Sequence, residues 1–165
     1  MKLLKRILLS LAVLFILIQF IRPDMNSSTV PAEKGITSEF SVPPDVHRVL
    51  KQSCFDCHSN RTVYPWYAHI QPVGWWLADH IKEGKEHLNF DDFAGRRPRV
   101  QYHAFEEVQE MITEDDMPLP SYLILHRDAV LSDESKEMLI RWTKAMRDSM
   151  KLHYPPDSLE RRRIL

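Results

Sequence analysis

The stretch KQSCFDCHSN, residues 51–60, contains the only two cysteines of this 165-residue chain. Cys54 and Cys57 stand three positions apart, and His58 directly follows the second of them. Because positions i, i+3 and i+4 share one face of a helical turn, we expect the two thiols and the imidazole to face a common object. The sequence therefore predicts a binding centre at this turn, with the domain folded around it.

The C-x-x-C-H run is the attachment signature of c-type haem. We expect one covalently attached haem c, with Cys54 and Cys57 as its thioether residues and His58 as the proximal iron ligand. A thioredoxin-type thiol pair would stand in a βαβ pattern, which the sequence lacks. A structural zinc site needs four ligands, and the chain has no second pair of cysteines. A disulfide across two intervening residues would close too small a loop to stabilise much.

The composition is that of a single globular domain, with 44% hydrophobic and 27% charged residues. Four glycines against eleven prolines, with few alternating β-branched residues, argue against a β-rich fold. Residues 1–22 hold four of the 22 cationic residues and none of the 23 acidic ones, so the remaining chain carries a net charge of −5. A nucleic-acid-binding surface needs the opposite sign, and we expect no nucleic-acid partner.

The first 22 residues have the pattern of a membrane-targeting segment. A short cationic start, MKLLKR, precedes the uninterrupted apolar run ILLSLAVLFILIQFI at Ile7–Ile21. No small-x-small cleavage site follows, which favours a signal anchor over a cleaved signal peptide. We expect residues 1–22 to form a single transmembrane helix in the inner membrane, with all that follows in the periplasm. If the leader is cleaved, the protein is soluble in the periplasm.

The rest of the chain divides into three parts. Residues 23–41 mix proline, serine, threonine and asparagine without apolar periodicity, which indicates a flexible linker. We expect a haem domain over residues 42–153 and a basic, proline-broken tail over residues 154–165. Apolar residues at spacings of three and four predict helices that begin near Pro44, Pro72, Val100 and Ser132. Long loops are expected at 59–71, 89–99 and 114–131.

A sixth iron ligand must come from a distant part of the chain. Met117 stands in DDMPLPSY (residues 115–122), an acidic loop stiffened by Pro118 and Pro120, and not on an apolar helical face. We therefore predict Met117 as the distal ligand. The alternative is His126 in LILHRDA, because two histidines also ligate haem iron, and an open site is the third possibility.

Two further contacts of the haem site are expected from nearby residues. A proximal histidine usually donates its second N–H to a backbone carbonyl, and we predict Pro65 or Pro72 as the acceptor. One of the adjacent Trp75 and Trp76 is a candidate for donating its indole N–H to a haem propionate.

The residues 54–90, CFDCHSNRTVYPWYAHIQPVGWWLADHIKEGKEHLNF, resemble the haem-binding domain family of bacterial periplasmic, c-type-cytochrome-like proteins. Residues 115–142, DDMPLPSYLILHRDAVLSDESKEMLIRW, resemble the later half of the same domain. The resemblance implies an all-α, class I cytochrome c-like fold of about four helices around one haem, in addition to the N-terminal membrane helix. It also implies Met117 as the distal ligand, since the distal methionine of class I cytochromes precedes a proline ahead of the C-terminal helix.

Together these features predict a membrane-tethered monohaem cytochrome c that transfers single electrons in the periplasm and is not an enzyme. The expected partners are redox proteins of the respiratory or periplasmic chain, and the inner membrane. The alternative is a haem-based sensor or a peroxidase-like haem enzyme with a displaceable sixth ligand, for which His126 leaves room.

Overall fold

Helices form all the regular structure of the described part of the chain. The computed structural model describes residues 1–160, which contain no β-strand; Ser27 and Arg61 form an isolated antiparallel bridge. The α-helices are α1 (Lys2–Ile18), α2 (Pro44–Ser53), α3 (Phe55–His58), α4 (Val73–His87), α5 (Pro98–Thr113), α6 (Pro120–Leu123), α7 (Asp133–His153) and α8 (Pro156–Leu159). Short 3-10 turns are η1 (Ile36–Ser38), η2 (Trp66–His69), η3 (Phe90–Asp92) and η4 (Arg127–Ala129). The predicted all-α class is confirmed.

The four helices predicted for the domain correspond to α2, α4, α5 and α7. Proline occupies the first turn of α2 and of α5, where a backbone N–H has no partner within the helix. Ser132 caps α7, because its Oγ accepts a hydrogen bond of 3.2 Å from the Ser135 N–H. The short helices α6 and α8 were not predicted: α6 lies in a segment expected to be a loop, and α8 lies in the expected tail. Each has four residues, which are too few to show a periodic pattern of apolar residues.

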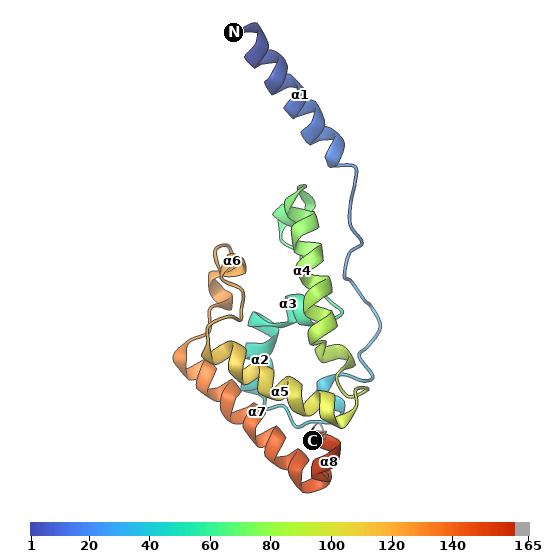
Figure 1. The fold of residues 1–165 in the computed structure, drawn as a ribbon, viewed down its shortest axis with the longest axis vertical. Coiled ribbons are helices and arrows are strands. Elements are labelled where there is room, and N and C mark those ends of the chain that lie inside the picture. The colour runs from blue at the N-terminus through green and yellow to red at the C-terminus, as the bar shows by residue number, and fades with distance from the viewer. Residues whose placement is uncertain (161–165) are drawn as a thin grey trace, which may run out of the picture.

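The main core lies where α5 and α7 pack against each other and against α2 (Figure 1). Phe93, Phe105 and Leu139 are fully buried within it. Phe105 meets Trp142 edge-on, with ring centroids 5.6 Å apart. The Trp142 indole N–H donates to the Ser41 carbonyl at 3.0 Å, so α7 also holds the chain just ahead of α2.

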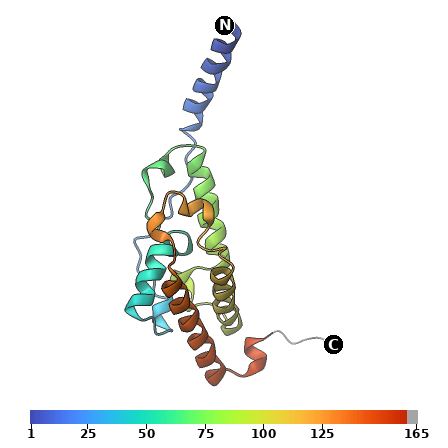
Figure 2. The same cartoon turned by 90° about the vertical axis from the view of Figure 1, so that its left-hand side faces the viewer.

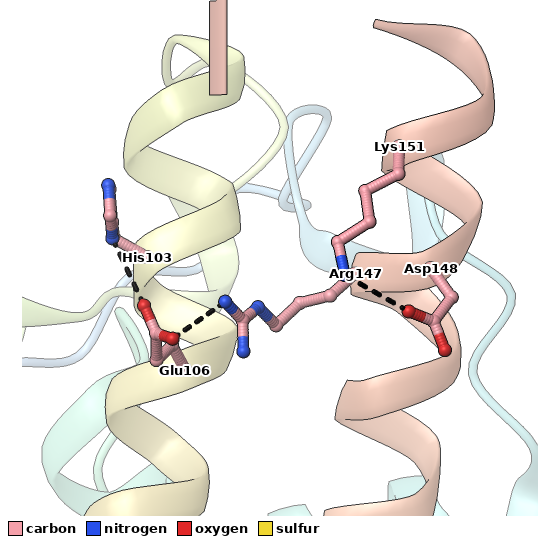
Figure 3. A network of polar contacts seen from close by, with 5 residues as sticks. All are labelled: His103, Glu106, Arg147, Asp148 and Lys151. Carbon is pink, nitrogen blue, oxygen red and sulfur yellow. Dashed lines mark hydrogen bonds and ion pairs between the residues drawn. The ribbon is translucent and has the colours of Figure 1, made fainter. Parts of the chain in front are cut away.

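A polar network joins α5 to α7 beside this core (Figure 3). Arg147 on α7 donates from Nη2 to Glu106 on α5 at 2.7 Å, and His103 Nδ1 lies 3.3 Å from the same carboxylate. Within α7, Lys151 pairs with Asp148 at 3.4 Å. The Arg147–Glu106 pair thus links α7 to α5 and favours one alignment of the two helices along their length.

A second, smaller cluster of buried side chains is enclosed by α4 and η2. It consists of Ala68, Leu77 and Ile81, with Cys57 and Tyr64 packed against it. The helix α4 points away from the main core and reaches it through the residues after its C-terminal end (Figure 1). The domain therefore has two apolar centres, and α3 lies between α2 and α4.

The segment predicted as a flexible linker lies along the domain and makes several hydrogen bonds. Asn26 donates from Nδ2 to the Ser59 carbonyl and to Thr62 Oγ1, both at 2.8 Å. Its Oδ1 accepts from Lys85 Nζ at 2.7 Å. Further along, Ile36 is buried in the main core, ahead of the predicted start of the domain. The flexibility and the boundaries of the predicted segments stay a prediction.

Helix α1 extends away from the domain, and none of its residues is buried (Figures 1 and 2). Among residues 1–160 no helix has both the length and the apolar character needed to cross a membrane. At the other end, residues 161–165 of the predicted basic tail lie outside the described residues. The preceding part of that tail forms α8, whose Leu159 is buried in the main core.

Candidate haem site

The C-x-x-C-H motif forms a separate turn of helix. Cys54 ends α2 with a non-helical backbone (φ −126°) and begins α3. Its carbonyl accepts hydrogen bonds from the N–H groups of Cys57 at 3.2 Å and of His58 at 2.9 Å. The predicted helical turn is therefore present, and both thiols remain free in this structure. Such a turn presents Cys54, Cys57 and His58 together.

The two thiols belong to different apolar centres. Cys54 packs against the main core, and Cys57 packs against the smaller cluster of α4 and η2. The motif therefore stands at the junction of the two. A large apolar group attached to both cysteines, such as haem, would contact both clusters and bury apolar surface of each.

Both thiols are held in their protonated form at neutral pH. Burial raises the pKa of the Cys54 thiol to about 12, and the neighbouring Cys57 adds to the rise. Burial also raises the pKa of the Cys57 thiol to about 11, with a further contribution from the charge of Asp56. Thiols of this kind are weak nucleophiles on their own, so they do not resemble the activated cysteines of thiol-disulfide enzymes.

The imidazole of His58 is fixed by the end of α4. Its Nδ1–H donates to the backbone carbonyl of Leu88 at 2.9 Å. The prediction that Pro65 or Pro72 supplies this carbonyl is wrong. The acceptor is Leu88, directly after α4, because the course of this helix brings its C-terminal end next to His58. Burial lowers the pKa of His58, which favours the neutral ring. With Nδ1 engaged, Nε2 is left as the nitrogen that can bind a metal.

Gly84 allows α4 to approach the motif closely. A Cβ atom at this position would lie 3.1 Å from the Cys57 carbonyl oxygen and 3.4 Å from His58 Cε1. A larger side chain would push the helix away from the histidine ring and from its acceptor at Leu88. The residue therefore sets the distance between α3 and α4.

Asp56, inside the motif, holds the surrounding loops. Its Oδ1 accepts from the Val63 N–H at 3.1 Å, and its Oδ2 accepts from the Tyr122 hydroxyl at 2.8 Å. Thr62 Oγ1 donates to the Asp56 carbonyl at 2.6 Å. Sequence reasoning missed Asp56 and Tyr122 as site residues, because no spacing relates position 56 to position 122.

Tyr122 is also the centre of an aromatic group. The His126 ring stacks on it, with centroids 3.9 Å apart and planes 11° apart. The Tyr67 hydroxyl lies 3.2 Å from His126 Nε2 and 3.3 Å from Nδ1. Burial raises the pKa of both tyrosines, and the charge of Asp56 adds to each rise, so both hydroxyls keep their protons at neutral pH.

The two candidates for the sixth ligand lie on the same segment, which Tyr122 joins to the motif. Met117 follows α5 and donates its N–H to the Met111 carbonyl at 3.2 Å. His126 follows α6 and stacks on Tyr122, and Tyr122 in turn is hydrogen-bonded to Asp56. The structure therefore brings the segment to the motif, and the choice between Met117 and His126 stays a prediction.

Trp75 has a role other than the one expected. Its indole N–H donates to the Ile21 carbonyl at 2.7 Å, so Trp75 binds the segment after α1 and is not free to donate to a haem propionate. Trp76 packs against His80, with ring centroids 4.2 Å apart. Of the two tryptophans, only Trp76 remains a candidate for donating to a haem propionate.

The comparison with protein families agrees with this arrangement. The family described as haem-binding domain matches residues 13–145, most of the chain. The chain belongs to the haem-binding domain family. Membership supports haem binding, and the free thiols of Cys54 and Cys57 together with the oriented His58 fit that cofactor. No curated protein and no solved structure matches the chain, so the class I cytochrome c-like fold stays a prediction.

Proposed function

We propose that this member of the haem-binding domain family binds one haem c, with thioether bonds from Cys54 and Cys57 and His58 as the axial iron ligand. The observation that carries the proposal is the hydrogen bond of 2.9 Å from His58 Nδ1 to the Leu88 carbonyl. It fixes the ring and its tautomer, raises the basicity of the other nitrogen, and leaves Nε2 as the atom that would bind the iron. Attachment explains why the only two cysteines of the chain stand in this motif.

The function that we propose is transfer of single electrons. Haem supplies the one-electron couple of its iron, and the protein supplies rigid surroundings. Thr62, Val63 and Leu88 form hydrogen bonds with residues of the motif, and Gly84 lets α4 pack closely against it. Surroundings that move little between two charge states favour rapid electron transfer, and they perform no bond-making step. Met117 is the sixth ligand in this proposal, with His126 as the alternative.

We further propose that α1 anchors the protein in the inner membrane, with the haem domain in the periplasm and redox proteins as its partners. In support, α1 contains no charged residue beyond Arg6, none of its residues is buried against the domain, and its first residues are cationic. The chain beyond residue 22 carries a net charge of −5, which suits a partner with a basic docking surface.

A haem sensor or a peroxidase-like enzyme is the second candidate, and the aromatic group around Tyr122 favours it. Tyr67 and His126 carry hydrogen-bonding groups of the kind that a bound gas or peroxide would require. His126 stacks on Tyr122, which is hydrogen-bonded to Asp56 of the motif. Carbon monoxide distinguishes the two functions. A six-coordinate ferrous protein that does not bind it supports the electron carrier, and rapid binding supports the sensor or the enzyme.

The test is expression of the full chain with a c-type haem maturation system, followed by intact-mass analysis and a pyridine haemochrome spectrum. The expected product carries the mass of one haem and has the spectrum of a haem with both vinyl groups saturated. Cys54→Ala and Cys57→Ala each leave one thioether, and the double variant leaves none. A purified chain with the mass of its amino acids alone would refute the proposal.

A further inference from the structure

The end of α1 is fastened to the domain by three hydrogen bonds. The Gln71 N–H donates to Gln19 Oε1 at 2.8 Å, and Gln19 Nε2 donates to the Gln71 carbonyl at 3.1 Å. The Trp75 indole N–H donates to the Ile21 carbonyl at 2.7 Å. These three bonds, here called the Gln19–Trp75 clamp, place the beginning of α4 beside the end of α1 (Figures 1 and 2).

Exposed apolar side chains lie on the segments that the clamp joins. We call them the apical patch: Phe20, Ile21, Trp66, Ile70 and Val73. Phe20 is 81% exposed and Trp66 is 76% exposed. Several large apolar side chains exposed on one end of a domain indicate an interaction site, because contact of apolar surface with water is unfavourable.

The segments that carry the apical patch contain no acidic residue, and Asp24 and Asp79, which follow directly after them in the sequence, line one pocket with Trp75. None of the 23 acidic residues lies in residues 1–23 or in residues 57–78, which include α1, η2 and the beginning of α4. The exposed cation Arg22 lies just after α1, next to Phe20 and Ile21 of the apical patch in the sequence. Apolar segments that carry cationic groups and no anionic groups of their own complement the negatively charged surface of a bilayer.

We propose that the apical patch lies in the headgroup layer of the membrane that holds α1, so that the domain is fixed on the lipid surface. The inference rests on the proposed anchor. If the apolar side chains of α1 are in hydrocarbon, the clamp leaves the apical patch within a few residues of that boundary. Tryptophan suits the position, because its amphipathic ring is enriched where hydrocarbon meets water.

The orientation of α4 determines where the haem site stands. The helix begins at the apical patch, and Gly84, where a Cβ atom would meet Cys57 and His58, lies eleven positions beyond Val73. At a rise of about 1.5 Å per residue, the site stands on the order of 16 Å further along the helix axis. A fixed orientation would present the haem site to partners at a constant height above the membrane.

The test uses the full chain with haem attached, in vesicles of phosphatidylethanolamine and phosphatidylglycerol. With both native thiols in thioethers, Trp66→Cys introduces a single site for an environment-sensitive fluorophore. Leu152→Cys is the matched control, because Leu152 is 85% exposed near the C-terminal end of α7. On transfer from detergent to vesicles, we expect the label at position 66 to shift its emission to shorter wavelength and lose access to aqueous iodide. The label at position 152 should change in neither respect.

A second pair of variants tests the clamp itself. Gln19→Ala combined with Trp75→Phe removes its hydrogen bonds, and we expect the label at position 66 to regain iodide access while the protein still floats with the vesicles. Equal iodide access at both labelled positions in vesicles would overturn the inference. Protection that also occurs in detergent and increases with protein concentration would assign the patch to a second copy of the chain, and would overturn it too. Failure to float would instead refute the proposed anchor.

Discussion

The Tyr122 hydroxyl donates a hydrogen bond of 2.8 Å to Asp56 Oδ2, across 66 positions of sequence. Asp56 stands between the two cysteines of the motif, and Tyr122 stands between the two candidates for the sixth iron ligand. The bond therefore fastens the segment with Met117 and His126 to the segment that holds Cys57 and His58. In the proposed haem site, this bond would couple the position of the sixth ligand to that of His58.

Tyr122→Phe should destabilise the protein by about 1–2 kcal/mol, because it removes a half-buried hydrogen bond to a carboxylate. In the haem-loaded protein it should also loosen the sixth ligand. We expect carbon monoxide to bind the ferrous form faster than in the parent. Chemical denaturation measures the first effect, and stopped-flow absorbance measures the second.

A double-mutant cycle with Asp56→Ala isolates the pair, since each single variant also changes other contacts. The two single effects should add up to more than the effect of the double variant. Simple additivity, together with an unchanged rate of carbon monoxide binding, would show that the link does not control the ligand segment.

Gly84→Val should separate α4 from the motif. Its Cβ would already lie 3.1 Å from the Cys57 carbonyl oxygen, and the two γ-methyl groups need further space. We expect a loss of about 1–3 kcal/mol from overpacking. In the haem-loaded protein the reduction potential should change as well, because the Leu88 carbonyl that holds His58 moves with the helix. Redox titration and thermal unfolding measure the two effects.

Glu83→Val is the control for Gly84→Val, because it places the same β-branched side chain on an exposed position of the same helix. It should cost less than about 1 kcal/mol in helix propensity and leave the potential as in the parent. A potential shifted equally by both variants would remove the contact at Gly84 from the explanation.

The helices of the domain could be predicted because each shows a local pattern. Apolar spacing marks α4 and α5, proline starts α2, and Ser132 caps α7. The attachment motif is local in the same sense, since its three residues lie within five positions. Features that depend only on neighbours along the chain can therefore be predicted from the order of the amino acids.

The contacts that orient the site could not be predicted, because they join distant positions. Leu88 lies 30 positions from His58, and its carbonyl carries no side-chain signal. A proline near the motif is a reasonable candidate for the acceptor, but the path of α4 determines which backbone carbonyl lies next to the His58 ring. The clamp between Gln19 and Gln71, 52 positions apart, is equally invisible to periodicity.

Asn26→Ala tests how firmly the segment after α1 is held. The amide of Asn26 binds Ser59, Thr62 and Lys85, so its removal leaves two acceptors and a cation without their partner. We expect a loss of about 1–2 kcal/mol in the free energy of unfolding. Hydrogen exchange of the Thr62 N–H, which donates to the Asn26 carbonyl at 3.0 Å, should become faster. The same exchange rate in the variant and the parent would support the flexible linker expected from the sequence.

Met117→Ala decides between the candidates for the sixth ligand. If Met117 binds the iron, its loss should turn the iron high-spin, lower the reduction potential and open the site to carbon monoxide. Met146→Ala is the matched control, because Met146 packs against the main core and is not a candidate ligand. Because Met146 is only partly buried, the variant should cost about 0.5–3 kcal/mol of stability and leave the spectrum unchanged. If His126→Ala gives the high-spin spectrum and Met117→Ala does not, the ligand is His126, and the loop before α6 serves only to bring that histidine to the site.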